Sequence, residues 1–339
     1  MPDLSAGVSR FKRLDASSHL SQGGALSQGG TMGVALSVYT HPSMLQHDPG
    51  PGHPESPDRL AAVLGALEGL PGLDPFADAM PVAREDLLRI HPAAYVDLVF
   101  NSAPREGRVP LDPDTWMSPM SLDAALRACG AVTGAVRAVA RGEIDRAFCA
   151  VRPPGHHAEP ERANGFCLFS SLAVAAAVAR AEGFRRVAIV DFDVHHANGT
   201  QAALQDDPDL FVGSIHQMPL FPGTGHADEA GGGSWVNVPV APHTAREAWR
   251  QAFEAGILGP LDAFAPDLIL VSAGFDAHRR DPLAHQSLET EDFAWATRAI
   301  LGVARRHCRG RLVSSLEGGY DLQALGQSAR AHVTALQEV

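Results

Sequence analysis

The chain has 339 residues, of which 45% are hydrophobic and 19% charged, and its formal net charge is −12. A chain of this length and composition can bury the core of a large globular domain. The acidic charge argues against a nucleic-acid-binding protein, because phosphate contacts need clustered Lys and Arg. No stretch approaches the ~18 consecutive apolar residues of a membrane span, so we expect no membrane partner.

The four cysteines show neither a CxxC pair nor the spacing of a disulfide framework. The N-terminus lacks the apolar segment of a signal peptide. Together these features predict a reducing, cytoplasmic location. Residues 1–31 are rich in Ser, Gly and Gln and contain LSQGG twice. That composition predicts a disordered tail, followed by one folded domain over residues 32–339.

Beyond the tail, short apolar runs alternate with amphipathic stretches. The predicted strands cover residues 34–39, 147–151, 187–190, 210–215, 237–240, 268–272 and 312–315. The predicted helices cover residues 58–70, 90–100, 121–142, 171–182 and 290–303, with others opening near residues 244 and 322. We expect Ser121 to cap one helix, a Thr244–Glu247 capping box to open another, and residues 112–119 to form a loop. Strand, loop and helix in repetition predict an α/β fold, with a parallel sheet covered by helices on both faces.

One stretch, VAIVDFDVHHANGT at residues 187–200, organises the rest. Its apolar run is typical of a strand buried on both faces. Asp191, Asp193, His195, His196 and Asn198 follow at once. Such groups are costly to desolvate unless a metal or hydrogen bonds compensate them. Because ligands bind at the carboxyl ends of strands in open α/β sheets, the stretch predicts a metal site.

Asp193 and His195 are two residues apart, so in extended geometry both side chains point the same way. Asp276, after the strand at 268–272, is the best candidate for a third ligand. Two carboxylates and one imidazole suit a three-ligand hydrolytic site for Zn²⁺, or for Fe²⁺. Taken singly, Asp193 would cap a turn and His195 would be an ordinary loop histidine; the set at the strand ends favours the metal.

Tandem histidines, His156 and His157, follow the strand at 147–151. Asp191 and Asn198 are available as distinct partners for the two rings. Different partners would give two imidazoles of different pKa, which acid–base chemistry on a water molecule needs.

Three aromatic side chains complete the candidate site. Tyr320 follows two glycines that allow close approach of the backbone, and its phenol could donate to an oxyanion. The alternative is a Tyr packed at a strand end with its hydroxyl in solvent. Phe166 and Phe221 lie in Gly- and Pro-containing loops, where they either line a narrow channel or pack beneath the loops.

At this point the chain resembles the zinc-dependent histone deacetylase family, on the side of its class II and bacterial amidohydrolase members. The motifs run in the family's order over nearly the whole chain beyond the tail: HPESPDR (53–59), RPPGHHA (152–158), NGFC (164–167), DFDVHHANGTQ (191–201), SIH (214–216), FPGTG (221–225), SAGFDAH (272–278), DPL (281–283) and EGGY (317–320). The resemblance implies a single-domain, arginase/deacetylase-like fold with a mostly parallel eight-stranded sheet.

The resemblance also implies roles for individual residues. Asp193, His195 and Asp276 would bind zinc. His157, paired with Asn198, would be the general base and then the acid, while His156, paired with Asp191, would act mainly electrostatically. Tyr320 would stabilise the oxyanion. A second cation, potassium, would be held by the backbone around Asp191, Asp193, His195 and Ile215, with Ser214. The acyl-lysine channel would be lined by Gly165, Phe166, Phe221 and Gly319, with Arg59 near its floor.

The expected activity is therefore hydrolysis of acetyl or other short acyl groups from amines such as acetyl-lysine in a peptide or protein. An acetylpolyamine or other small-molecule amidohydrolase is the first alternative, but those relatives tend to carry an acidic gatekeeper where this chain has Leu283. A ureohydrolase with two manganese ions and a catalytically weak acyl-binding protein are further alternatives. The acyl group and the oligomeric state stay open.

Overall fold

The computed structural model describes residues 35–73, 76–229 and 234–339. The predicted tail, residues 1–31, lies outside these described residues. Val34–Val339 group as one unit.

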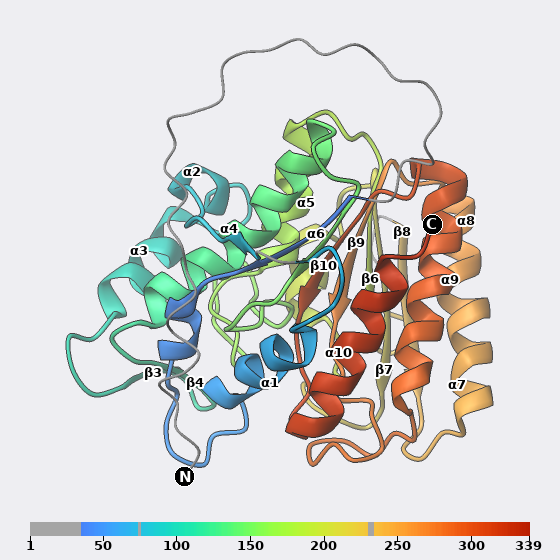
Figure 1. The fold of residues 1–339 in the computed structure, drawn as a ribbon. Coiled ribbons are helices and arrows are strands. Elements are labelled where there is room, and N and C mark those ends of the chain that lie inside the picture. The colour runs from blue at the N-terminus through green and yellow to red at the C-terminus, as the bar shows by residue number, and fades with distance from the viewer. Residues whose placement is uncertain (1–34, 74–75, 230–233) are drawn as a thin grey trace. The chain divides into compact units, whose positions relative to one another are not determined.

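Eight parallel strands form the central sheet (Figure 1). The sequence pattern predicted a parallel sheet, and the family resemblance predicted that it has eight strands. Their order across the sheet is β2-β1-β5-β10-β9-β6-β7-β8, and every neighbouring pair is parallel. The strands are β1 (Leu36–Thr40), β2 (Ala77–Asp78), β5 (Arg146–Cys149), β6 (Val187–Asp191), β7 (Leu210–Gln217), β8 (Ser234–Val240), β9 (Leu268–Ala273) and β10 (Leu312–Leu316). In the described residues a helix lies between each two consecutive strands of this sheet, except between β7 and β8, and such helices form the crossover connections that parallel strands require.

Helices cover both faces of this sheet. In Figure 1, α1, α10 and α9 lie side by side on the face toward the viewer, with α4 and α5 packed together on the other. The helices are α1 (Pro57–Leu67), α2 (Arg84–Leu87), α3 (Ala93–Ser102), α4 (Ser121–Ala140), α5 (Ser171–Ala181), α6 (Asn198–Leu204), α7 (Arg246–Phe253), α8 (Gly259–Phe264), α9 (Thr290–Cys308) and α10 (Leu322–Leu336). A 3₁₀ turn spans Pro42–Gln46, and a π turn, Glu254–Leu258, joins α7 to α8. Among the described residues, no helix combines the length and apolar character needed to cross a bilayer.

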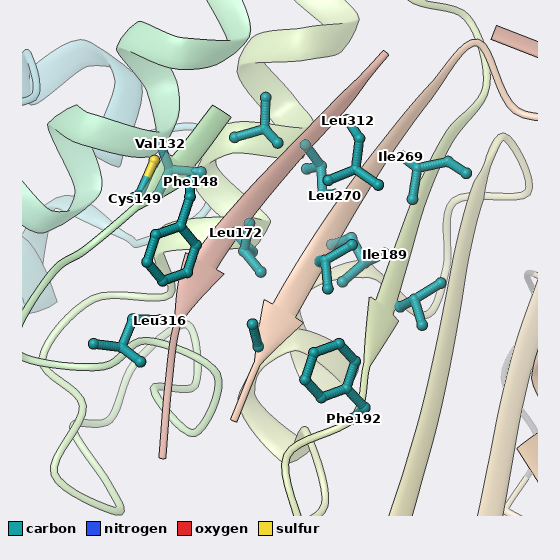
Figure 2. Close-up of a cluster of buried hydrophobic side chains, with 14 of the residues drawn as sticks. Val132, Phe148, Cys149, Leu172, Ile189, Phe192, Ile269, Leu270, Leu312 and Leu316 are labelled. Atoms are coloured by element: carbon teal, nitrogen blue, oxygen red, sulfur yellow. The ribbon is translucent and has the colours of Figure 1, made fainter. Parts of the chain in front are cut away.

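The central strands are buried along their whole length, as their apolar runs indicate. Phe148, Ile189, Leu270 and Leu312 belong to one continuous core and are at most 1% exposed (Figure 2). Each such side chain contributes about 1.5–3 kcal/mol through its burial. This packing holds the ends of the strands in fixed positions, and the polar loops begin there.

The predicted loop at 112–119 is wrong. Residues Val109–Asp112 (β3) and Thr115–Met117 (β4) form a small antiparallel hairpin. The Asp and Pro residues that suggest a loop occupy its turn. Met117, fully buried, anchors the second strand in a satellite core beside α3 and α4.

Two expected helix caps are also wrong. Ser121 is already the first residue of α4, and its Oγ accepts the Ser118 N–H at 2.7 Å. The Thr244 hydroxyl donates to the Ala241 carbonyl at 2.6 Å, and α7 begins only at Arg246. The capping box lies instead at α9, where the side chains of Glu289 and Asp292 each accept the other's backbone N–H. Local sequence patterns cannot tell a capping hydroxyl from one that bonds elsewhere. Here the Ser121 and Thr244 hydroxyls bond to backbone groups that precede them in the chain.

A buried histidine in the core predicts a pH-dependent loss of stability. The His332 Nδ1–H donates to Thr297 Oγ1 at 2.6 Å, since that hydroxyl itself donates to the Phe293 carbonyl at 2.6 Å. Nε2 then accepts from Ser314 Oγ at 2.9 Å. Burial lowers the pKa of His332 from 6.5 to about 3. Below about pH 6.5 the unfolded chain therefore binds a proton at His332 that the native chain does not bind. As the pH decreases from about 6.5 toward 3, the free energy of unfolding falls by about 1.4 kcal/mol per pH unit.

The test compares wild type with His332→Gln, whose amide can still donate and accept but does not titrate. Urea unfolding at pH 6.5 and pH 5 should show that wild type loses about 2 kcal/mol more than the variant. Equal losses would show that His332 does not carry this pH dependence.

Candidate active site

The chemically unusual loops meet at one edge of the sheet. They follow β5, β10, β9 and β6, which are consecutive neighbours in the sheet order. Because these strands are parallel, all four loops leave from their carboxyl ends. The structure thus brings together the loops that carry the tandem histidines, Tyr320, Asp276 and the Asp193–His195 pair.

Asp193, His195 and Asp276 form a buried cluster whose three ligand atoms all lie within 4.8 Å of one another. His195 Nδ1 lies 3.0 Å from Asp193 Oδ1 and 3.1 Å from Asp276 Oδ2. Each carboxylate also accepts one distant backbone N–H: Asp193 Oδ2 that of Gly318 at 2.8 Å, and Asp276 Oδ1 that of Val194 at 2.8 Å. These contacts orient the two carboxylates toward the imidazole.

Two glycines make room for the cluster. A Cβ atom on Gly274 would lie 2.0 Å from Asp193 Oδ2, and one on Gly318 would lie 2.0 Å from Asp276 Oδ2. Neither distance is compatible with a side chain. Both positions must be glycine for the carboxylates to sit where they do, a steric reason distinct from backbone freedom.

The electrostatics of the cluster fit a dication. Burial and the neighbouring Asp193 charge raise the pKa of Asp276 to about 6. Burial would also raise the pKa of Asp193, but the charges of His156 and His195 and a hydrogen bond from His195 hold it low. Two carboxylates this close and this buried need compensating positive charge. Oxygen and imidazole donors in a three-ligand set are those that zinc and iron(II) accept.

The tandem histidines make the two separate contacts that the sequence predicted. His156 Nδ1 lies 3.0 Å from Asp191 Oδ2, and His157 Nδ1 lies 2.7 Å from Asn198 Oδ1. Burial lowers the pKa of His156, but the charges of Asp193 and Asp191 outweigh it and raise it to about 10. Burial, together with the charges of His156 and His195, lowers the pKa of His157 well below its usual value. The pair therefore combines one cationic and one neutral ring.

Tyr320 lies between a buried cation and an aromatic ring. The Arg59 guanidinium lies 4.8 Å from the centre of the Tyr320 ring, and the Phe166 ring lies 6.0 Å from it, edge to face. Phe221, 41% exposed, contacts His157 edge to face at 5.0 Å. Burial raises the pKa of the Tyr320 hydroxyl well above 10, so it stays a donor. Both phenylalanines thus flank the candidate catalytic groups.

The backbone around Phe166 is unusual. Gly165 and Phe166 both adopt positive φ angles, 51° and 71°. A Cβ on Gly165 would lie 2.4 Å from His157 Cδ2, so glycine is required there. The Phe166 N–H donates to Thr115 Oγ1 at 2.9 Å, which ties this strained residue to the β3–β4 hairpin. No pattern in the sequence indicates that Thr115 supports Phe166 in this way.

The residues expected around a second cation are also neighbours. Ser214 pairs in register with Asp191 across β7 and β6, and Ile215 follows it in β7. The Ser214 hydroxyl lies 2.9 Å from His216 Nδ1 and accepts the Ala197 N–H at 3.5 Å. The structure thus brings together the residues that the family resemblance implies around a second cation.

Comparison with known proteins agrees with this geometry. The model of the histone deacetylase domain family matches residues 53–336. The chain belongs to the histone deacetylase family. Among its relatives, the histone deacetylase-like amidohydrolase of Pseudomonas aeruginosa is 40% identical over 279 residues, covering 79% of this chain and 73% of the relative. A probable deacetylase of Archaeoglobus fulgidus is 36% identical, and the alignment covers 86% of this chain and 82% of that relative.

A solved structure confirms the fold predicted for this deacetylase family member. The crystal structure of the HDA15 HD domain superposes with a TM-score of 0.85 at 33% identity, covering 90% of this chain and 88% of that one. The arginase/deacetylase-like architecture is therefore shown by the sheet topology and by this match.

Two buried acids of this deacetylase homologue escaped the sequence-based prediction. Glu317 Oε2 accepts the N–H groups of Gly155 at 2.7 Å and His156 at 3.2 Å, which anchors the histidine loop to the end of β10. Glu55 lies in a buried network with Arg59 and Arg152. A glutamate before two glycines gives no signal of its own, because the donors it meets lie 161 and 162 residues away.

The crowding at Gly318 predicts a metal-binding defect. Gly318→Ala should lower metal affinity by about 100-fold or more. The added methyl group must displace Asp276 or Asp193, and metal binding depends on the positions of these two carboxylates. Gly134→Ala is the matched control, because that helical glycine has open space around its Cβ position. Competition with a fluorescent zinc chelator measures both. Unchanged affinity in Gly318→Ala would mean that the carboxylates move freely.

Proposed function

We propose that this member of the histone deacetylase family is a zinc-dependent amidohydrolase that removes acetyl or other short acyl groups from primary amines such as the lysine side chain. The supporting observation is the convergence, at one sheet edge, of the Asp193–His195–Asp276 cluster, the differently charged histidine pair and the Tyr320 phenol. Family membership supports the reaction class, and the geometry supports these residues as its agents.

The metal would be held by Asp193, His195 and Asp276. Zinc so bound supplies Lewis acidity toward an amide carbonyl and a water molecule. His157, neutral and oriented by Asn198, accepts the proton of the attacking water. The Tyr320 hydroxyl donates a hydrogen bond to the oxyanion that forms as the carbonyl carbon becomes tetrahedral.

The second half of the reaction returns the proton. As the carbon–nitrogen bond breaks, His157 passes its proton to the leaving nitrogen, so a carboxylate and a free amine are released. His156, held cationic by Asp191 and Asp193, stabilises negative charge without transferring a proton. The backbone around Asp191, Asp193, His195 and Ile215, with Ser214, would hold a structural potassium ion.

We further propose that the substrate reaches the site between Phe166 and Phe221, with Gly165 and Gly319 shaping the passage and Arg59 beneath Tyr320. Leu283, a half-buried apolar residue, would lie at its rim. An apolar rim favours an extended acyl-lysine side chain over a polycationic acetylpolyamine, which an acidic gatekeeper would attract.

Side-by-side turnover of an acetyl-lysine peptide and acetylspermidine by the zinc-loaded protein tests the proposal. We expect cleavage of the peptide in preference to the polyamine, and a loss of about 10²–10³-fold in kcat in Tyr320→Phe. Preference for acetylspermidine would place the chain with the small-molecule amidohydrolases. Tight binding of both compounds without turnover would favour an acyl-binding role and contradict the proposed catalysis.

A further inference from the structure

The peptide group that joins Gly319 to Tyr320 is held at both ends by charged side chains. Its carbonyl accepts a hydrogen bond from Arg59 Nε at 2.6 Å, and its N–H donates to Asp281 Oδ2 at 2.7 Å. Arg59 is fully buried and Asp281 is 7% exposed. A cation at the carbonyl and a carboxylate at the N–H both complement the peptide dipole, and charge-assisted hydrogen bonds of this kind are the stronger ones.

We propose that Asp281 is a positioning residue for the Tyr320 phenol, and that the same carboxylate couples the phenol to the Leu283 rim. The inference rests on the proposed function and extends it to a residue outside the reacting groups. Asp281 Oδ1 accepts the Leu283 N–H at 2.9 Å while Oδ2 accepts that of Tyr320. One carboxylate thus joins the loop after β9 to the loop after β10.

The contact with Tyr320 is more than a local turn. The hydrogen bond from the Leu283 N–H to Asp281 spans two residues and is an ordinary Asx turn. The hydrogen bond from the Tyr320 N–H to Asp281 joins groups that are 39 residues apart in the chain. Gly319 has a φ of 122°, a conformation accessible chiefly to glycine, and without a Cβ this residue does not itself restrict the orientation of the following peptide plane. The Arg59 contact fixes only the carbonyl end of the peptide plane. The Asp281 contact fixes the other end, from which the Tyr320 side chain departs.

Neighbouring contacts reinforce this connection. Arg280, adjacent to Asp281, forms an ion pair with Asp321, adjacent to Tyr320. Asp321 also caps α10 by accepting the Ala324 N–H at 2.8 Å. The segment with Tyr320 is therefore bonded to the loop after β9 at two consecutive residues, Tyr320 and Asp321, and continues into α10. A shift of about 1 Å in a catalytic group can cost about 100-fold in rate, so this anchoring has a measurable consequence.

Asp281→Ala removes both acceptors, whereas Asp281→Asn keeps one oxygen and turns an amide donor toward the other N–H. We expect Asp281→Ala to lower kcat on an acetyl-lysine peptide by about 10–100-fold with KM changed less than about threefold, and Asp281→Asn to fall between it and wild type. Asp267→Asn is the matched control. Asp267 accepts the N–H groups of Arg185 and Arg186 at the opposite end of β9, so this variant should keep wild-type kcat.

A double-mutant cycle separates positioning from general damage. In the Tyr320→Phe background, Asp281→Ala should cost less than about threefold, because its effect acts through the missing hydroxyl. An equal cost in both backgrounds would overturn the proposal. If Asp281→Ala fails to fold, Asp281→Asn takes its place in the cycle with the same expectation.

A spectroscopic measurement tests the positioning without turnover or metal. The chain has three tyrosines, so 3-fluorotyrosine labelling should give three ¹⁹F resonances, and Tyr320→Phe assigns one of them. Asp281→Ala should shift or broaden the Tyr320 resonance and leave the other two in place. An unchanged Tyr320 resonance would overturn the inference. If the wild-type protein cleaves no amide, the proposed function fails while this result still decides the position of Tyr320.

Discussion

Asp276→Asn is expected to abolish metal binding at the candidate centre and to lower amide hydrolysis by about 10³-fold or more, since Lewis-acid catalysis supplies several kcal/mol. The asparagine oxygen can keep the hydrogen bond from the Val194 N–H, which leaves the amide nitrogen facing His195. An amide nitrogen offers no lone pair to a metal, so the ligand set loses a member without a change in side-chain size.

The same variant should not destabilise the metal-free protein. Burial and the Asp193 charge raise the pKa of Asp276, so its charged form is costly when no metal is bound. Metal analysis, turnover and thermal melting of the apoprotein measure the three effects together. Asp262→Asn, which alters an exposed pair with Arg306 and His307, serves as the control. One zinc per chain with wild-type turnover in Asp276→Asn would contradict the assignment of Asp276.

The second large effect is expected at the tandem histidines, where two adjacent rings should behave differently. His157→Ala should lower kcat by about 10²–10⁴-fold, because it removes the neutral ring proposed as general base and acid. His156→Ala removes a cationic ring that transfers no proton, and we expect a smaller loss.

Rates as a function of pH distinguish the two roles. His157→Ala should lose the limb of the kcat profile that reports the general base, whereas His156→Ala should keep both limbs at reduced height. Both variants replace a buried histidine by alanine, so they are matched in size and burial. Each leaves the hydrogen-bond partner of the lost ring, Asn198 or Asp191, in place. Wild-type kcat in His157→Ala, or equal losses in both variants, would contradict the proposed division.

The strands and the candidate ligands could be predicted from the sequence because their signals are local. The buried run at 187–190 is apolar at consecutive positions, and Asp193 and His195 follow it at a spacing that turns both toward one side. The order of the strands could not be predicted from local signals. That β10 and β9 lie between β5 and β6 depends on pairings between residues far apart in the chain.

The omissions at Gly318 and Asp281 share one physical cause, which is that the residues they contact lie far away in the chain. Gly318 reads as a flexible glycine before a tyrosine, yet its function is steric, because Asp193 and Asp276 occupy the space of its missing side chain. Asp281 reads as the start of a turn, and only the folded chain shows that its second oxygen reaches Tyr320. The hairpin at 109–117 was missed because its turn residues outweigh its short strands in any local pattern.

Zinc titration of the metal-free protein, followed by acetyl-lysine peptide turnover, tests the central claim most directly. The account predicts no turnover without metal, and turnover that rises in proportion to added zinc and reaches its maximum at one ion per chain. Hydrolysis that persists in the metal-free protein would contradict a metal-dependent mechanism at this site. A maximum reached only at two ions per chain would contradict the single three-ligand centre and favour a two-metal hydrolase.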